Sequence, residues 1–392
     1  MKPFVRRSLL PLLGLCAVAV GCKLSKSPDC MPFPAPSLSG ATCKALSTPT
    51  LLRDLGGAEF GGGDTTVALT VDDTAIYFTM NASADAISAL FRMPKSGGVP
   101  AVLDDGVIAP IQIDGPTLVY TRMVATPQSG GFSITYPNVI QLGDQCLFDT
   151  LPNAGGTRSV QGAPAIDGAG GVLWLASSSG SAPPSILRWD PVTATTSVVG
   201  SASSVYVTGF ASDADHLYLA ELTDSSTATT TIFAMPSTGG TQGQLASVPG
   251  QVSIAGVDSD SVYVAPTAFG GTMAGGSFTR IDKATGVATA LSDVSGSVAN
   301  RVHDSNVYWA LGDRVLRSPK AGGPSEVVLD LGDESTSILA MAFDDCNVYV
   351  AGTVSSPPTS AGRTTASSAI WGQSLPAATS ATAPDASAPV GD

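Results

Sequence analysis

Histidine and charged residues are scarce in this chain of 392 residues, and both shortages restrict what it can do. It has two histidines, His216 and His303, and Lys, Arg, Asp and Glu together make up 13% of the residues. A hydrolytic triad needs a histidine within reach of a nucleophile, but both histidines stand at turn positions that hold Asp, Ser or Asn elsewhere in the sequence. Gly-x-Ser-x-Gly, P-loop, Gly-x-Gly-x-x-Gly and His-Glu-x-x-His motifs are absent. We therefore expect no cofactor.

Metal ligands are scarce as well. No Cys-x-x-Cys occurs, so a zinc site is not expected. Acidic pairs such as Asp72-Asp73, Asp258/Asp260 and Asp344-Asp345 could supply oxygen ligands for Ca²⁺. Most of them recur at turn positions, where hydrogen bonds to the backbone explain them without an ion. We expect no metal.

Basic residues are outnumbered: 19 Lys and Arg stand against 32 Asp and Glu, which gives a net charge of −13. Such a surface repels phosphate backbones and anionic lipid head groups. Nucleic acid is therefore not an expected partner, and attachment to a membrane would have to be covalent.

A covalent anchor is predicted at the N-terminus. Lys2, Arg6 and Arg7 precede an apolar run over 8–20 that is too short to span a bilayer. The run closes with Ala19-Val20-Gly21-Cys22, which resembles the lipobox of bacterial lipoproteins. The resemblance implies a signal peptide over 1–21, a lipidated Cys22 and, because no Asp follows the cysteine, the outer membrane of the cell envelope. The alternative is an ordinary secretory leader with an incidental cysteine.

A short pattern returns seven times along the rest of the chain. An apolar residue is followed by Asp and two or three polar or small residues, then by an apolar residue and Tyr or Trp. The aromatic positions, 41 to 54 residues apart, are Tyr77, Tyr120, Trp174, Tyr218, Tyr263, Tyr308 and Tyr349. A near-constant period of this length is typical of a β-propeller blade. The sequence predicts an all-β, seven-bladed propeller of four-stranded antiparallel blades over 48–376.

Turn residues divide each repeat into strands. In the first repeat we expect strands over 67–71, 75–80, 89–93 and 100–103. The turn over 94–98, Pro-Lys-Ser-Gly-Gly, recurs over 151–156, 235–240 and 318–323. Proline fixes φ at the start of this turn, and glycine provides the positive φ that lets two strands reverse. The strand copies over 76–79, 217–220, 262–265 and 307–310 resemble the YWTD and NHL classes of propeller repeat. Together with the turns at Pro94-Lys95 and Pro319-Lys320, they also resemble the repeats common in secreted bacterial propeller lipoproteins.

The seventh repeat contains three expected strands, over 338–343, 348–351 and 369–375. We predict that residues 49–55 supply its fourth strand and close the ring from the N-terminal side. Pro- and Ser-containing residues 22–47 are then a tether, and residues 377–392 are predicted to be disordered because they carry almost no large apolar side chain.

Four cysteines remain after the leader and Cys22: Cys30, Cys43, Cys146 and Cys346. In an oxidising compartment they suggest two disulfides. Cys43 precedes the closing strand and Cys346 lies in a turn of the blade it would complete, so we favour Cys43–Cys346 with Cys30–Cys146. Pairing Cys30 with Cys43 remains the alternative.

Long connections between second and third strands, over 122–138, 266–277 and 352–368, share one predicted face of the propeller. Its candidate contact residues are Phe132, Tyr136, Phe269, Met273 and Arg363. Carboxylates that could serve catalysis near the ring axis are few: Asp104, Asp105, Asp330, Asp333 and Glu334. We therefore predict a protein that is not an enzyme and binds an envelope protein or polysaccharide through this face. The alternatives are a glycan-active or lyase-type enzyme and a purely structural surface lipoprotein.

Overall fold

The computed structural model consists of strands and turns. It describes residues 22–23, 25–26, 46, 48–55, 65–81, 88–114, 117–122, 124–128, 131–135, 138–142, 145–148, 159–167, 169–177, 182–193, 195–224, 229–267, 276–294, 297, 299–332, 336–355 and 366–376. None of the elements in this described part is a helix long and apolar enough to cross a membrane. The all-β class predicted from the sequence is confirmed.

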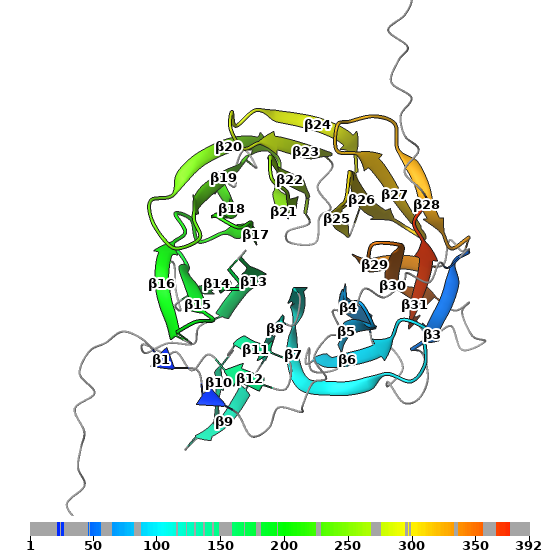
Figure 1. Cartoon of the computed structure of the whole chain (residues 1–392), viewed down its shortest axis with the longest axis horizontal. Helices are drawn as coiled ribbons and strands as arrows, with labels where there is room; N and C mark the ends of the chain where they lie inside the picture. Colours follow the sequence, from blue (N-terminus) through cyan, green and yellow to red (C-terminus); the bar gives the residue numbers. More distant parts are fainter. Residues whose placement is uncertain are drawn as a thin grey trace, which may run out of the picture.

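The strands form antiparallel sheets arranged around a ring, as in a β-propeller (Figure 1). Three consecutive repeats each form one sheet of four strands, which pair in chain order from the inner to the outer edge. These sheets comprise β17 (Val207–Ser212), β18 (His216–Asp224), β19 (Thr229–Pro236) and β20 (Gly243–Pro249); β21 (Val252–Val257), β22 (Ser261–Pro266), β23 (Ser277–Asp282) and β24 (Ala288–Asp293); and β25 (Asn300–His303), β26 (Asn306–Leu311), β27 (Arg314–Pro319) and β28 (Glu326–Asp330). The repeat period thus corresponds to a four-stranded unit here.

The third repeat forms a similar sheet with an added edge strand. It contains β13 (Ser159–Ile166), β14 (Val172–Ser177), β15 (Ser185–Asp190) and β16 (Thr195–Ser201). The short strand β1 (Cys22–Lys23) pairs with the outer edge of β16. Part of the expected tether, including Cys22, therefore lies along this sheet.

The prediction of seven separate blades is wrong at the first two repeats, and the described strands form six ring sheets. The first two repeats share one eight-stranded sheet, which contains β4 (Thr65–Val71), β5 (Ala75–Asn81), β6 (Ser88–Pro94), β7 (Ala101–Asp114), β8 (Thr117–Arg122), β11 (Asn138–Leu142), β12 (Gln145–Phe148) and β2 (Ser25–Lys26). The reason is β7, which runs through 14 residues without a break and pairs with both β6 and β8. Asp105-Gly106 does not end the strand, because the extended chain continues and buries Val107.

A small hairpin lies outside these sheets. It consists of β9 (Val124–Gln128) and β10 (Gly131–Thr135) and occupies the long connection over 122–138. The connection that the sequence presents as a loop is therefore partly paired.

The last sheet joins the two ends of the propeller sequence. Its order is β29 (Thr336–Phe343), β30 (Asn347–Ser355), β31 (Ala366–Ser374) and then β3 (Thr50–Asp54). Leu51 pairs with Trp371 and Asp54 with Ala369, and the Leu55 amide donates to the Ser368 carbonyl at 2.7 Å. The strand expected over 49–55 is thus the outer strand of the sheet that follows the seventh aromatic repeat (Figure 1).

Apolar side chains fill the spaces between neighbouring sheets. All seven aromatic residues of the repeat pattern are at most 3% exposed. Between the first and last sheets, Leu69, Ile76 and Phe78 pack in one cluster with Ala340 and Ile370. The aromatic residue of each repeat is therefore a packing residue.

Candidate functional site

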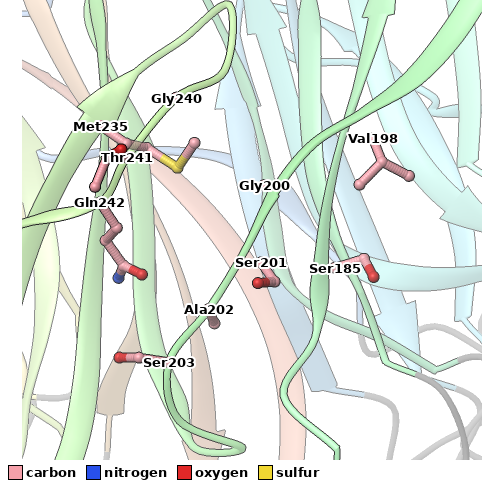
Figure 2. Close-up of a pocket in the computed structure, with 10 residues that line it drawn as sticks. All are labelled: Ser185, Val198, Gly200, Ser201, Ala202, Ser203, Met235, Gly240, Thr241 and Gln242. Atoms are coloured by element: carbon pink, nitrogen blue, oxygen red, sulfur yellow. The ribbon is translucent and has the colours of Figure 1, made fainter.

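An open groove of about 550 Å³ lies between the sheets of the third and fourth repeats (Figure 2). Its volume is in the range of ordinary ligand pockets. One side belongs to β15, β16 and the chain after them, and the other to the end of β19 and the turn before β20. The lining residues are Ser185, Val198, Gly200, Ser201, Ala202, Ser203, Met235, Gly240, Thr241 and Gln242.

The groove wall is set where β16 ends and the chain crosses to the fourth repeat. The Ala202 amide donates to the Pro184 carbonyl at 2.9 Å. The Ser204 hydroxyl then donates to the Leu222 carbonyl at 3.1 Å and accepts from the Tyr206 amide at 3.1 Å. These contacts fasten the crossing segment to strands β15 and β18.

A buried carboxylate lies behind the groove and orients two of its lining residues. Glu221 of β18 is fully buried. It accepts hydrogen bonds from the Ser203 amide at 3.1 Å, the Ser203 hydroxyl at 2.5 Å, the Ser204 amide at 2.8 Å and Gln242 Nε2 at 2.7 Å. A buried charge is costly unless several donors satisfy it. Glu221 therefore holds the crossing segment and Gln242 of the neighbouring turn in fixed positions.

The lining of the groove is uncharged and combines polar with apolar side chains. Hydroxyl groups come from Ser185, Ser201, Ser203 and Thr241, and Gln242 supplies an amide. Gln242 Nε2 is directed to Glu221, so its amide oxygen remains to accept from a ligand. Val198 is 63% exposed and adds apolar surface at the edge. Such a groove suits a neutral ligand rich in hydroxyl groups.

A second feature lies on the inner side of the ring. Arg301 is on the inner strand β25 (Figure 1). Its side chain is exposed, yet desolvation by the surrounding protein lowers the pKa of its guanidinium. Nη1 donates to the Asn300 carbonyl at 2.9 Å, and no ion pair links Arg301 to an acid among the described residues. This guanidinium could receive an anionic group of a ligand.

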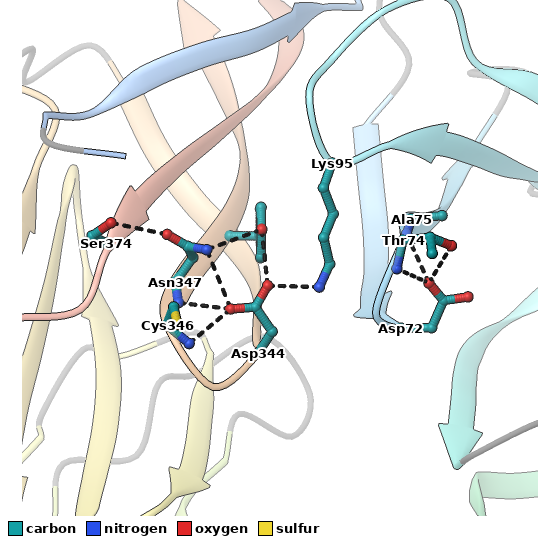
Figure 3. Close-up of polar contacts among 9 residues, drawn as sticks. Asp72, Thr74, Ala75, Lys95, Asp344, Cys346, Asn347 and Ser374 are labelled. Atoms are coloured by element: carbon teal, nitrogen blue, oxygen red, sulfur yellow. Dashed lines mark hydrogen bonds and ion pairs between the residues drawn. The ribbon is translucent and has the colours of Figure 1, made fainter. Parts of the chain in front are cut away.

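The aspartates of the repeat pattern make turn contacts, as expected. Asp72 Oδ1 accepts from the Thr74 and Ala75 amides at 2.7 Å each (Figure 3), and Asp72 Oδ2 accepts from the Tyr77 hydroxyl at 2.6 Å. The same Asp–Tyr bond recurs at Asp213–Tyr218, Asp258–Tyr263 and Asp344–Tyr349. Burial first, then the bond to Asp258, raises the pKa of Tyr263 to about 12. No group of three or more potential ligands that could hold a metal ion occurs in the described part of the chain.

Three of these aspartates also bind a lysine from the next sheet around the ring. Lys95 reaches Asp344 at 2.6 Å, Lys283 reaches Asp213 at 2.5 Å, and Lys320 reaches Asp258 at 2.9 Å. Each lysine comes from the turn between the third and fourth strands of its repeat. The turn aspartates therefore fasten neighbouring sheets together and are not free for catalysis.

The residues proposed from the sequence for the loop face are not brought together in the described structure. Phe132 lies in β10, where only its backbone is described. Tyr136, Phe269, Met273 and Arg363 lie outside the described residues.

The sequence-derived candidates for catalysis are dispersed. Asp104 accepts from the Tyr120 hydroxyl at 2.7 Å, and Asp330 pairs with Arg314 at 3.0 Å. The side chain of Asp105 and the whole of Asp333 and Glu334 are outside the described part.

Among the cysteines, Cys22 is in β1 and Cys146 in β12, each described by its backbone alone. Cys30 and Cys43 lie outside the described residues. Cys346 is disulfide-bonded.

The groove was not predicted from the sequence. One signal was available: Glu221 directly follows the apolar strand segment over 217–220, where a carboxylate must find several donors to be buried. Its donors come from residues 17 to 21 positions away, in segments whose sequence indicates only turns.

No protein-family model matches the chain, and no curated protein matches it. Solved structures do. The propeller domain of the Trilobed protease from Pyrococcus furiosus is 10% identical with a TM-score of 0.53, over 74% of this chain and 92% of that one. An oligogalacturonate lyase from Vibrio parahaemolyticus is 10% identical with a TM-score of 0.52, over 89% and 97%. A puromycin hydrolase is 13% identical with a TM-score of 0.50, over 76% of this chain; the match spans about half of that enzyme.

These similarities correct one expectation. The prediction that the protein is not an enzyme is wrong in its reasoning, which went from a propeller with few acids near its axis to a protein without activity. The structures that the chain resembles are propellers that are enzymes or parts of enzymes. At such low identity the likeness shows the fold alone and carries no substrate to this chain. The fold of the chain is that of a β-propeller.

Proposed function

We propose that this propeller is a glycan-active protein of the cell envelope that holds a neutral polysaccharide chain in the groove between its third and fourth repeats. The observation that carries the proposal is the lining itself: ten uncharged residues, with Ser203 and Gln242 fixed from behind by the buried Glu221. Preorganised polar groups lose little entropy on binding, which favours a ligand that offers many hydroxyl groups.

The charge of the whole molecule supports a neutral ligand. A net charge of −13 disfavours the approach of polyanions. Because none of the lining side chains is charged, a ligand needs no opposite charge to bind in the groove.

The proposal includes an envelope location with a lipid on Cys22. It is supported by the basic head, the short apolar run and the lipobox-like Ala19-Val20-Gly21-Cys22. Metabolic labelling with an alkyne fatty acid tests it: label is expected on the native chain and lost in Cys22→Ser. Label retained by Cys22→Ser would overturn the anchor.

Isothermal titration with neutral polysaccharides of bacterial envelopes tests the groove. Gln242→Ala is expected to weaken binding roughly 5- to 30-fold through loss of an anchoring hydrogen bond. Gln244→Ala is the matched control, because Gln244 lies two residues further on, in β20, and its Nε2 donates to the nearby Ser247 hydroxyl at 3.2 Å. Equal losses in both variants, or no binding of any neutral glycan, would contradict the proposal.

A second candidate is cleavage of an acidic glycan by a lyase reaction at the inner side of the ring. It is favoured by Arg301, whose guanidinium could neutralise a uronate carboxylate and so acidify the neighbouring C–H. The fold likeness to an oligogalacturonate lyase makes this reaction class worth testing. In this elimination a base takes the C5 proton, the C4=C5 double bond forms, and the C4–O bond breaks so that the leaving sugar departs as an alcohol once its oxygen is protonated. The unsaturated uronate that results absorbs ultraviolet light. Activity should appear with uronate polymers, fall at least tenfold in Arg301→Met and persist in Arg314→Met; no activity on any uronate polymer would reject this candidate.

A further inference from the structure

Tyr206 is the one exposed Tyr, Trp or Phe among the side chains that the structure describes. It is 50% exposed, whereas the seven aromatic residues of the repeat pattern are buried between the sheets. A single exposed apolar residue is ordinary on a protein surface and needs no ligand to explain it. Two further features distinguish Tyr206: its position beside the groove and the way its backbone is held.

Tyr206 lies on the same crossing segment as one wall of the groove. Ser201, Ala202 and Ser203 line the groove (Figure 2), and Tyr206 follows three residues after Ser203. The next residue, Val207, begins β17, which is the inner strand of the fourth sheet (Figure 1). The crossing segment therefore leads from the groove at outer strand β16 to the inner side of the ring, and Tyr206 lies at its inner end.

The backbone of Tyr206 is fixed on both sides. Its amide donates to the Ser204 hydroxyl at 3.1 Å, and its carbonyl accepts from the Leu222 amide at 2.9 Å. Val207 then pairs in register with Glu221, the buried carboxylate behind the groove wall. A tyrosine on a fixed backbone has only two χ angles to order, so its contact with a ligand costs little conformational entropy.

The groove and Tyr206 offer complementary contacts to a sugar chain. The lining supplies hydroxyl groups and the Gln242 amide, which suit the polar edge of a sugar ring. A tyrosine ring supplies a flat apolar surface with a polar tip. A pyranose whose substituents are all equatorial presents a matching surface, because axial C–H bonds cover both of its faces. An axial hydroxyl group places an oxygen on one face and makes that face less suited to the contact.

We infer that Tyr206 is a stacking residue for the glycan in the groove and selects β-linked chains of pyranoses with the all-equatorial configuration of glucose. The inference rests on the proposed binding of a neutral polysaccharide and names the class of its sugar units. The bound chain runs from β16 along the crossing segment, and one of its rings lies on Tyr206 at the inner side of the propeller.

Isothermal titration with cellohexaose and with β-linked mannohexaose, whose units carry an axial hydroxyl group, tests the inference. The native protein is expected to bind cellohexaose more tightly. Tyr206→Ala should weaken this binding roughly 3- to 10-fold, the range of an aromatic stacking contact, and should reduce the preference over mannohexaose. Tyr206→Phe retains the ring face, so its affinity should stay within about twofold of the native value. Val287→Ala is the control, because Val287 is equally exposed, at 59%, but lies in the fifth repeat away from the groove.

Gln242→Ala in the same titrations separates this inference from the proposed function. If Gln242→Ala weakens the binding of cellohexaose and Tyr206→Ala does not, the groove holds the glycan and the stacking contact is overturned. Equal affinities of the native protein for the two hexasaccharides would overturn the selectivity. If cellohexaose does not bind but another neutral polysaccharide does, only the inference fails; if no neutral glycan binds, both fail.

Nuclear magnetic resonance of isotope-labelled tyrosine rings reports on the contact itself. The Tyr206 ring signal is identified by its absence in Tyr206→Phe. On addition of cellohexaose it should shift and show Overhauser contacts to the axial protons of a single sugar face. An unshifted signal at saturating cellohexaose would overturn the stacking role, even with a weakened Tyr206→Ala.

Discussion

Asp258 shows how one side chain serves both its own turn and the next sheet. Its carboxylate accepts from the Asp260 amide at 3.1 Å, the Ser261 amide at 2.9 Å, the Tyr263 hydroxyl at 2.9 Å and Lys320 Nζ at 2.9 Å. Asp258→Ala leaves a buried tyrosine hydroxyl and two turn amides without this acceptor. We expect a loss of about 2–3 kcal/mol in the free energy of unfolding, measured by urea denaturation.

The control is Asp260→Ala, in the same turn. Asp260 contributes its amide to Asp258, and that amide is retained in alanine. The free energy of unfolding of Asp260→Ala should fall by no more than about 0.5 kcal/mol, as for most exposed positions. Similar losses in the two variants would show that turn formation in general, and not the Asp–Tyr–Lys contact, stabilises the repeat.

A second prediction for a single residue concerns Asp213 and the stability of the protein in acid. Burial acts to raise its pKa, but the bond from Lys283 and those from the His216 and Asp215 amides prevail and lower the pKa to about 2. A carboxyl with a lowered folded-state pKa contributes stability above its unfolded pKa near 4, and this stability is lost as pH falls toward 2. Tm should therefore be nearly constant from pH 7 to about 4.5 and fall steeply between about pH 4 and 2.

Lys283→Met should lower Tm at pH 7 and make the fall in acid smaller, with its end at higher pH, because the Asp213 pKa rises toward its unfolded value when its cation is removed. Arg314→Met is the control: Arg314 is 54% exposed in its pair with Asp330, and exposed pairs contribute little. An identical acid profile in native protein and Lys283→Met would contradict the role given to the lysine.

At the scale of elements, the turn over 94–98 carries a prediction about docking. Gly97 has φ 84°, and a Cβ added to it would lie 2.7 Å from the carbonyl oxygen of Leu52. Gly97→Ala combines backbone strain with a clash against a strand, whereas Gly312→Ala, at φ 60°, meets no atom within 4 Å. We expect about 1 kcal/mol lost in Gly312→Ala and at least 2 kcal/mol more in Gly97→Ala, compared by thermal unfolding. Equal losses would mean that the turn does not press on β3.

The strands around this turn were predictable because local chemistry fixes them. Alternation and the Asp–Tyr spacing predicted strands over 67–71 and 75–80, and β4 and β5 include both. The last sheet was predicted equally well, down to the strand over 49–55 that is observed as β3. In both places the signal is a few residues long and the structure that it specifies is equally local.

Sheet continuity was not predictable in the same way. Asp105-Gly106 has the composition of a turn, yet β7 continues through it, because pairing with β6 on one side and β8 on the other supports an extended chain. The groove was missed for a related reason: the donors that satisfy Glu221 lie in a crossing segment and a turn whose positions depend on packing between two sheets. The residue pattern of a single repeat therefore does not predict the contacts between neighbouring repeats.

At the scale of the whole molecule, the ring depends on contacts between residues far apart in sequence. The first sheet packs on the last through a cluster that includes Leu55, Leu69, Tyr349 and Ile370. Lys95 and Asp344 are 249 residues apart. Such non-local contacts form late and at high entropic cost, so the ends of the propeller should be its least stable joint.

Removing residues 1–56 tests this expectation, because it deletes β3 and leaves the edge of β31 without its partner. An unpaired edge strand is a template for pairing with another chain, so the shortened protein should unfold at lower temperature and form dimers or larger species in size-exclusion chromatography. Removing residues 1–42 is the control, since it retains Cys43, Leu46 and the whole of β3. We expect that form to remain monomeric if the native domain is monomeric, and to unfold within a few degrees of it. If both shortened proteins behave alike, the stability of the ring resides in the packing between its first and last sheets, and the outer strand supplied by the N-terminus is dispensable.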